Sequence, residues 1–279
     1  PVVTDATFAR TQLAAIPEAT GWPDVQLPRN AREFNVSETT FVYPPDVPGH
    51  AARVRISTPT SEVPVPGHPT IGTAVALAGQ GHGPDMVLEL GIGPNAATVD
   101  GQAARFTTEL PLSRGGCPAP GLVARCLGVP DAALRIDRHV PEIAGVGLPF
   151  CLAELTGPKA LATCVPDTAA FRNAQKAYPE LQDFAVFAYC RDGQGVRARM
   201  FAPLDNIPED PGTGSAAAAL AAYLAELGGA DVTLRITQGV EIGRPSHIAV
   251  SAVLGDGKAQ SVTVSGGAVQ VAEGQLTLP

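Results

Sequence analysis

The chain has 279 residues, of which 45% are hydrophobic and 16% are charged, and its formal net charge is −8 at pH 7. A chain of this length and apolar content can bury a large core, which excludes global disorder. Its 19 Lys and Arg residues are scattered, so the sequence lacks the basic cluster that binding to nucleic acid or to an anionic membrane requires.

Membrane insertion and secretion are not indicated either. No apolar run reaches the roughly 20 residues of a bilayer-spanning helix. Residues 1–10 lack a basic segment followed by an apolar stretch, the pattern of a secretory signal. We therefore expect a cytoplasmic protein with no membrane or nucleic-acid partner.

Apolar periodicity predicts a strand-rich chain with a few helices. In chain order, we expect strands at 38–43 and 52–58, a helix at 71–78, a strand at 86–91, helices at 121–127 and 167–177, a strand at 196–201, a helix at 216–227, and strands at 232–237, 247–253 and 261–271. Asp167 or Thr168 is the expected N-cap of the third helix. Strands grouped around one central helix per half indicate an α+β fold rather than alternating βαβ units.

Two short helical segments that carry almost no charge are each preceded by a Gly-rich polar elbow. The elbows are Gly67–Ala74 and Asp210–Ala217, and neither helical segment has a charged residue before Glu226. Such apolar helices are normally buried, and their unpaired N-terminal N–H groups favour a carboxylate or phosphate. The alternative is a pair of buried helices in which glycine serves only the tight turns. The recurrence of the elbow suggests an internal duplication, although mostly small residues recur.

The spacing of cysteines and histidines indicates neither a metal site nor a disulfide framework, and the glycine pattern indicates no nucleotide cofactor. The five cysteines are an odd number without a Cys-x-x-Cys pair, so we expect them to be reduced and mostly buried. The five histidines include no i, i+4 pair. A phosphate-binding Gly-x-x-x-x-Gly-Lys is absent, and Gly91 and Gly93 lack the third glycine of a dinucleotide fingerprint.

Three residues are candidates for acid–base chemistry. In an extended segment Glu38 shares a face with Thr40 and Val42, a setting that suits a desolvated general base, or it is a strand-edge carboxylate in solvent. Asp210 either caps the second helix or binds a substrate amine or orients His68. His68 either packs or caps, or donates to a substrate carboxylate.

Together these segments resemble one family. The strings are Ser37-Glu38-Thr39-Thr40-Phe41, Gly67-His68-Pro69-Thr70-Ile71-Gly72-Thr73-Ala74, Glu209-Asp210-Pro211-Gly212-Thr213-Gly214-Ser215-Ala216, and Gln238-Gly239 followed by Gly243-Arg244-Pro245-Ser246. In this order and spacing, over essentially the whole chain, they look like the PhzF-like isomerases of phenazine biosynthesis.

The resemblance implies the diaminopimelate epimerase-like fold: two pseudo-symmetric lobes, each a curved, mostly antiparallel sheet around a central helix, with the active site between them. The corresponding lobes are residues 1–115, with the central helix after Gly67–Thr70, and 116–265, with the central helix after Asp210–Ser215. Residues 266–279 would form a C-terminal segment that returns to the first lobe. The family also implies a homodimer.

The resemblance also implies roles for individual residues. Glu38 would carry a proton between two carbons without metal or organic cofactor, with His68 and Asp210 as the other catalytic residues. Ser37, Gly67, Gly214, Ser215 and Gln12 would bind a small carboxylate substrate.

Departures from the family pattern bear on the reaction and the substrate. The related two-cysteine racemases carry a thiol in each elbow, but those positions here look to be Pro66 and Pro211, which disfavours that mechanism. Near Asp5–Phe8, which resembles the family's first strand, the usual Gly-Asn-Pro is replaced by a segment in which Gln12 keeps an amide. Pro66 is unusual before Gly67, and Gly212 stands where the family often has alanine.

We therefore expect a substrate other than the phenazine precursor: a small unsaturated cyclic amino or imino acid of a specialised, antibiotic-type pathway, such as a pyrroline carboxylate. The leading hypothesis is an isomerase that moves a double bond. The alternatives are an epimerase that inverts one stereocentre, and a carboxylate-binding protein that has lost the chemistry.

Overall fold

A computed structural model describes residues 11–64 and 67–276 of the chain. These described residues divide into two compact units, one within residues 11–108 and 263–276 and the other made of residues 109–262. The lobe boundaries expected after residues 115 and 265 stay predictions. None of the helices in the described ranges combines the length and apolarity needed to span a bilayer.

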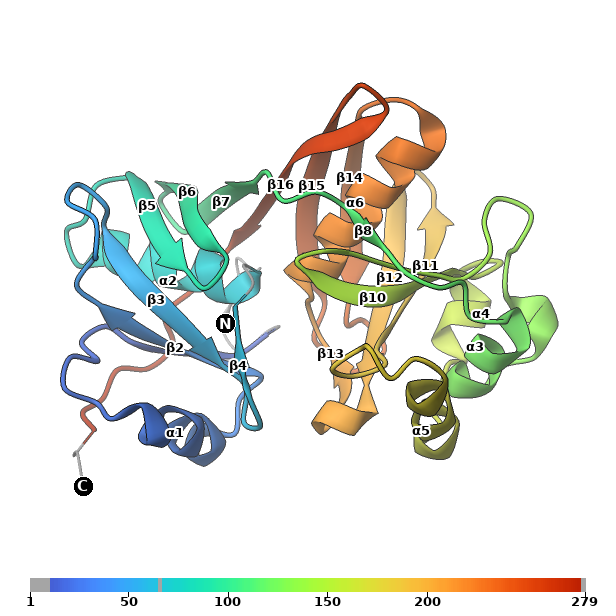
Figure 1. Ribbon diagram of the computed structural model, residues 1–279, viewed down its shortest axis with the longest axis horizontal. Helices are drawn as coiled ribbons and strands as arrows, with labels where there is room; N and C mark the ends of the chain where they lie inside the picture. Colours follow the sequence, from blue (N-terminus) through green and yellow to red (C-terminus); the bar gives the residue numbers. More distant parts are fainter. Residues whose placement is uncertain (1–10, 65–66, 277–279) are drawn as a thin grey trace. The chain divides into compact units, whose positions relative to one another are not determined.

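The first unit is a sheet with α2 against it (Figure 1). Its elements are β1 (Leu13–Ile16), the 3₁₀ helix η1 (Asp24–Gln26), α1 (Leu27–Phe34), β2 (Glu38–Tyr43), β3 (Ala52–Ser57), β4 (Glu62–Val63), α2 (His68–Gly79), β5 (Asp85–Leu90), β6 (Gly93–Asp100) and β7 (Ala103–Thr108). The sheet order is β1-β2-β3-β5-β6-β7.

The second unit is built in the same way around α6, which runs alongside β14 and β15 (Figure 1). Its elements are β8 (Ser113–Arg114), α3 (Pro120–Leu127), η2 (Asp131–Ala133), β9 (Glu142–Val146), β10 (Leu148–Glu154), α4 (Pro158–Ala162), α5 (Thr168–Ala177), β11 (Val186–Asp192), β12 (Gly195–Ala202), η3 (Pro203–Asp205), β13 (Ile207–Asp210), α6 (Gly214–Gly228), β14 (Val232–Gln238), β15 (Ser246–Gly255) and the start of β16 (Lys258–Gly267). Strand β16 continues into the first unit, where its end neighbours β7.

Strand pairing repeats from one unit to the other. In the first, β1 and β2 are parallel, β2 and β3 antiparallel, β3 and β5 parallel, and β5 and β6 antiparallel. In the second, β10 and β11, β11 and β12, β12 and β14, and β14 and β15 follow the same sequence of directions. A short strand, β4 or β13, pairs antiparallel with the strand before it and leads into the central helix. The same order of strand directions in both units is what an internal duplication would produce. The α+β prediction is confirmed.

The central helices begin earlier than the periodicity predicted. Helix α2 begins at His68 rather than residue 71, and α6 at Gly214 rather than residue 216. Thus the last elbow residues form the first helical turn. Pro69 is compatible with this position because N–H groups of a first turn have no intrahelical partner. Both helices are buried over most of their length, as their composition predicted.

Other local predictions agree closely with the structure. Strand β2 has the predicted limits, and β3, β5, β12, β14 and β15 differ from theirs by one or two residues at most. Strand β16 begins and ends earlier than expected. The side chain of Asp167 accepts hydrogen bonds from the N–H groups of Ala169 and Ala170, which confirms it as the N-cap of α5.

Candidate active site

The first elbow pairs a carboxylate with a buried imidazole. Glu38 is the first residue of β2 and His68 is the first residue of α2. The Nε2 atom of His68 lies 2.9 Å from Oε2 of Glu38, and the two side chains are 3% and 20% exposed. Oε2 of Glu38 is thus buried against the imidazole while the side chain as a whole stays partly exposed, the combination that a proton carrier needs.

The contact between β2 and α2 explains why these two residues meet. Thr73 Oγ1 donates a hydrogen bond of 2.9 Å to Thr40 Oγ1, and both side chains are fully buried. Thr40 lies two residues after Glu38, an advance of about 6.8 Å along a strand, and Thr73 lies five residues after His68, about 7.5 Å along a helix. The two advances are similar in length. The Thr40–Thr73 hydrogen bond therefore aligns β2 with α2 so that Glu38 lies close to His68.

The other predicted residues of the first unit lie around this pair. Strand β1 pairs with β2 so that Leu13 is opposite Glu38. The hydroxyl of Ser37 donates to the backbone oxygen of Gln12 at 3.0 Å, and Gln12 itself is exposed. Gly67 is buried, and its carbonyl accepts the N–H of Thr70 at 3.1 Å. Pro66 and the segment Asp5–Phe8 lie outside the described residues.

The second elbow carries its own buried carboxylate. Asp210 is the last residue of β13 and is 4% exposed. The Thr213 hydroxyl donates a short hydrogen bond to Oδ2 of Asp210, and Thr213 is the N-cap residue of α6. Gly214 and Ser215 are the first two residues of that helix. The structure thus brings Glu38 and His68 together in one unit and places Asp210 beside the start of α6 in the other.

Gln238, to which the sequence assigned no role, braces the second elbow. Its side chain is fully buried, and its Nε2 donates to the backbone oxygen of Asp210 at 2.7 Å and to Thr213 Oγ1 at 2.9 Å. Its Oε1 accepts the N–H of Thr213 at 3.1 Å. The sequence does contain a signal for Gln238. This residue follows Leu234 and Ile236 in the alternation of β14, so a polar side chain occupies a position on the apolar face of the strand.

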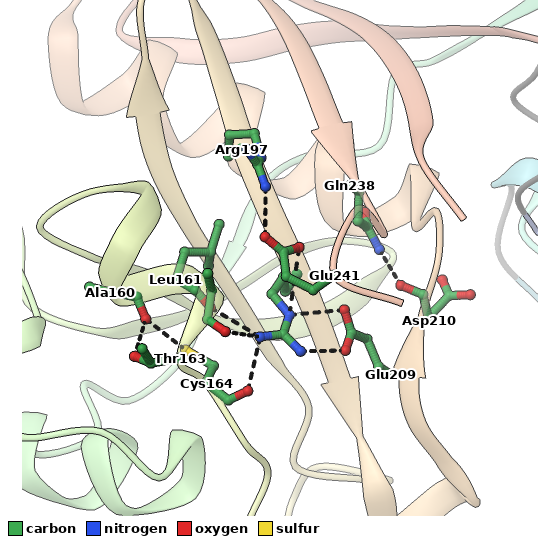
Figure 2. Close-up of polar contacts among 11 residues, drawn as sticks. Ala160, Leu161, Thr163, Cys164, Arg197, Glu209, Asp210, Gln238 and Glu241 are labelled. Atoms are coloured by element: carbon green, nitrogen blue, oxygen red, sulfur yellow. Dashed lines mark hydrogen bonds and ion pairs between the residues drawn. The ribbon is translucent and has the colours of Figure 1, made fainter. Parts of the chain in front are cut away.

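A buried ionic network lies next to this elbow (Figure 2). Arg199 of β12 makes two parallel hydrogen bonds with Glu209, of 2.9 and 2.6 Å, and also donates to the carbonyls of Leu161 and Cys164. The side chains of Arg199 and Glu209 are 7% and 8% exposed. A bidentate pair of this kind holds β13 firmly against β12 just before Asp210.

The five cysteines are free thiols that lie outside the elbows; four are buried, and Cys117 is exposed. Burial raises the pKa of the Cys126 and Cys164 thiols to about 12 and that of Cys190 to about 11. These thiols are therefore protonated near neutral pH and are poor nucleophiles or bases. Over residues 11–64 and 67–276, no three His, Cys, Asp or Glu side chains are arranged to hold a metal ion.

Comparison with known proteins agrees with this architecture. A family model described as a phenazine biosynthesis-like protein matches residues 2–274. The chain is 34% identical, over 99% of both chains, to a trans-2,3-dihydro-3-hydroxyanthranilate isomerase of Pseudomonas fluorescens. It is 33% identical to an uncharacterized isomerase of Mesorhizobium japonicum, over 99% of this chain and 96% of the relative.

A solved structure supports the fold. The Bacillus anthracis phenazine biosynthesis protein of the PhzF family matches with a TM-score of 0.86 and 20% identity, over 99% of this chain and 97% of that one. The sequence resemblance is therefore confirmed over the full length. This chain belongs to the phenazine biosynthesis-like family, PhzC-PhzF.

Proposed function

We propose that this protein is an isomerase that moves a double bond in a small unsaturated carboxylic acid by transferring one proton between two carbons through Glu38. The observation that carries the proposal is the 2.9 Å contact between Glu38 Oε2 and the buried Nε2 of His68. The isomerase names of the curated relatives support the reaction class.

The geometry suits a carboxylate that works first as a base and then as an acid. Oε2 of Glu38 is buried against the imidazole, which leaves Oε1 as the atom that accepts the proton from one carbon and returns it to another. No net proton is consumed, because the same carboxylate is regenerated at the end. His68 has little exposure, which keeps water away from one side of the carboxylate and strengthens its interaction with the imidazole.

The second elbow is proposed to bind the same substrate. The N–H groups of the first turn of α6, which have no partner within the helix, suit a carboxylate at a helix N-terminus together with Gly214 and the Ser215 hydroxyl. The buried carboxylate of Asp210 suits an amino or imino group. Gln12 and Ser37 lie next to Glu38 and complete the proposed set of binding residues.

These groups indicate the substrate class. One group of residues suits the carboxylate of a substrate, and the carboxylate of Asp210 suits its nitrogen. Together they fit a small unsaturated cyclic amino or imino acid, as found in specialised, antibiotic-type pathways. The name of the Pseudomonas fluorescens relative specifies an acid of this class. Replacement of the usual Gly-Asn-Pro by the segment with Gln12 favours a member of the class other than the substrate of that relative.

Deuterium uptake tests the proposal. The purified chain is incubated in heavy water with a panel of such acids that includes trans-2,3-dihydro-3-hydroxyanthranilate and pyrroline carboxylates. We expect uptake at the acceptor carbon for at least one compound. Glu38→Gln should lower the rate by about 10²- to 10⁴-fold, the usual contribution of a positioned acid–base group. The matched control is Glu33→Gln, which changes an exposed glutamate on α1.

The outcomes separate the competing functions. Full activity of Glu38→Gln in a normally folded chain would exclude Glu38 as the proton carrier. A product with an unmoved double bond and one inverted centre would establish an epimerase. Saturable binding without exchange across the panel would establish a carboxylate-binding protein.

A further inference from the structure

The duplicated topology allows the two elbows to be compared position by position. The strand after each central helix, β5 or β14, ends immediately before a glycine, Gly91 or Gly239. A Cβ atom on Gly91 would lie 2.7 Å from Cβ of Pro64, and one on Gly239 would lie 2.7 Å from the backbone oxygen of Pro211. In each unit a glycine thus allows the end of this strand to approach the segment that leads into the central helix.

The residue just before that glycine is apolar in the first unit and polar in the second. In the first unit it is Leu90, 6% exposed, which can only pack. In the second it is Gln238, fully buried, whose amide makes three hydrogen bonds to Asp210 and Thr213. A buried amide is retained at low cost only when its donors and acceptor are used, as they are here. The polar brace is therefore specific to the second elbow.

The amide can have only one orientation. Its oxygen faces the N–H of Thr213, and its nitrogen faces the carbonyl of Asp210. The reversed amide would set two donors against each other at Thr213 and two acceptors against each other at Asp210. The Nε2 group therefore donates to the Thr213 hydroxyl oxygen, and that hydroxyl directs its own proton to Oδ2 of Asp210.

We propose that Gln238 is a positioning residue for the reaction: by donating to Thr213 Oγ1, it fixes the direction of the Thr213 hydroxyl and thereby the orientation of the Asp210 carboxylate toward substrate. This inference rests on the proposed function of Asp210. Gln238 acts through Thr213 and has no contact with the reacting atoms.

The test is a double-mutant cycle. Gln238→Leu gives the second elbow the residue type that the first unit has at Leu90. Thr213→Val removes the hydroxyl but keeps the backbone N–H. The double variant closes the cycle, and Ile236→Val serves as the control, because it removes one buried methyl group from the same face of β14 without touching a hydrogen bond.

Two measurements are made on all variants. Hydrogen exchange of the Thr213 amide, followed by mass spectrometry or NMR, reports on the brace without any substrate. We expect exchange about 10-fold faster in Gln238→Leu, with protection retained in Thr213→Val and Ile236→Val. The deuterium-uptake assay, with the compound that the wild-type chain turns over, gives kcat/KM. We expect a loss of about 100-fold for each single variant, no further loss in the double variant, and wild-type activity for Ile236→Val.

Each result supports or contradicts the proposal. Equal amide exchange in Gln238→Leu and the wild type would show that Gln238 does not hold the elbow. Additive losses of kcat/KM in the double variant would show that Gln238 does not act through the Thr213 hydroxyl. If the wild-type chain turns over no compound, the proposed function fails and the positioning role fails with it. Amide exchange would then still decide whether the brace exists.

Discussion

The Nε2 atom of His68 lies 2.9 Å from Oε2 of Glu38, so the first residue of α2 and the first residue of β2 form a pair in the first unit. The imidazole is almost completely buried, and the carboxylate is partly exposed. One partner is therefore fixed by packing and can hold the other, which remains available to a substrate.

The role of His68 can be tested by changing what it donates. His68→Leu keeps the site filled but removes the imidazole nitrogen that lies against Glu38, and we expect the deuterium-uptake rate to fall by about 100-fold. His68→Gln restores a donor, so its rate should lie between those of the wild type and His68→Leu. The control is His82→Gln, which changes an exposed histidine just after α2. Equal rates in His68→Leu and the wild type would remove His68 from the proposed site.

The Arg199–Glu209 pair predicts a large stability effect. Arg199→Met leaves the buried Glu209 carboxylate without its bidentate partner, so the free energy of unfolding should fall by about 3–5 kcal/mol. Arg199→Met combined with Glu209→Leu should regain most of this loss, because no charge is then left unpaired. Urea denaturation measures both. Asp46→Asn, in the pair of Asp46 and Arg53 whose side chains are 72% and 39% exposed, should cost at most about 1 kcal/mol. A similar small cost for Arg199→Met would contradict the prediction.

We expect Glu142 to contribute to the free energy of unfolding in a pH-dependent way. Two hydrogen bonds from the Arg114 guanidinium, of 2.6 and 2.8 Å, lower the pKa of Glu142 below its ordinary value of 4.5, against the opposing effect of burial, and the Tyr223 hydroxyl also donates to the carboxylate. A pKa that is lowered by folding stabilises the folded state above about pH 4.5. The stabilisation is lost as the pH falls through the lower, folded-state value.

The comparison with Glu142→Gln makes this measurable. The difference in unfolding free energy between the wild type and this variant should be largest near neutral pH and should shrink as the pH falls below about 4.5. Urea denaturation at a series of pH values gives the difference. Glu180→Gln, at an exposed position of the same unit, should show little difference at any pH. A difference for Glu142→Gln that stays constant down to the lowest pH would exclude the ion pair as its source.

Some elements could not be predicted because their burial leaves no pattern. Strand β9 is buried at every position, and β10 and β11 are buried over five consecutive residues each. Alternation between apolar and polar residues arises only where one face of a strand meets solvent. Strands covered on both faces read as short apolar runs, which periodicity does not distinguish from loops or buried helices. Strands β14 and β15, which each have one exposed face, were predicted closely. Strands β6 and β7 also alternate in burial but were missed, because several of their buried positions carry Ala, Asn or Thr rather than large apolar residues.

The sequence by itself determined the α+β class, the buried central helices and the family, and it narrowed the cap of α5 to Asp167 or Thr168, because each is recorded in local patterns or in motifs with fixed spacing. It also marked Glu38, His68 and Asp210 as candidates. Only the tertiary structure decided which side chains meet: Glu38 with His68, Gln238 with Thr213, and Arg199 with Glu209. A local pattern fixes how deeply a residue is buried, whereas its partner depends on how distant strands and helices pack, and that information is spread over the whole chain.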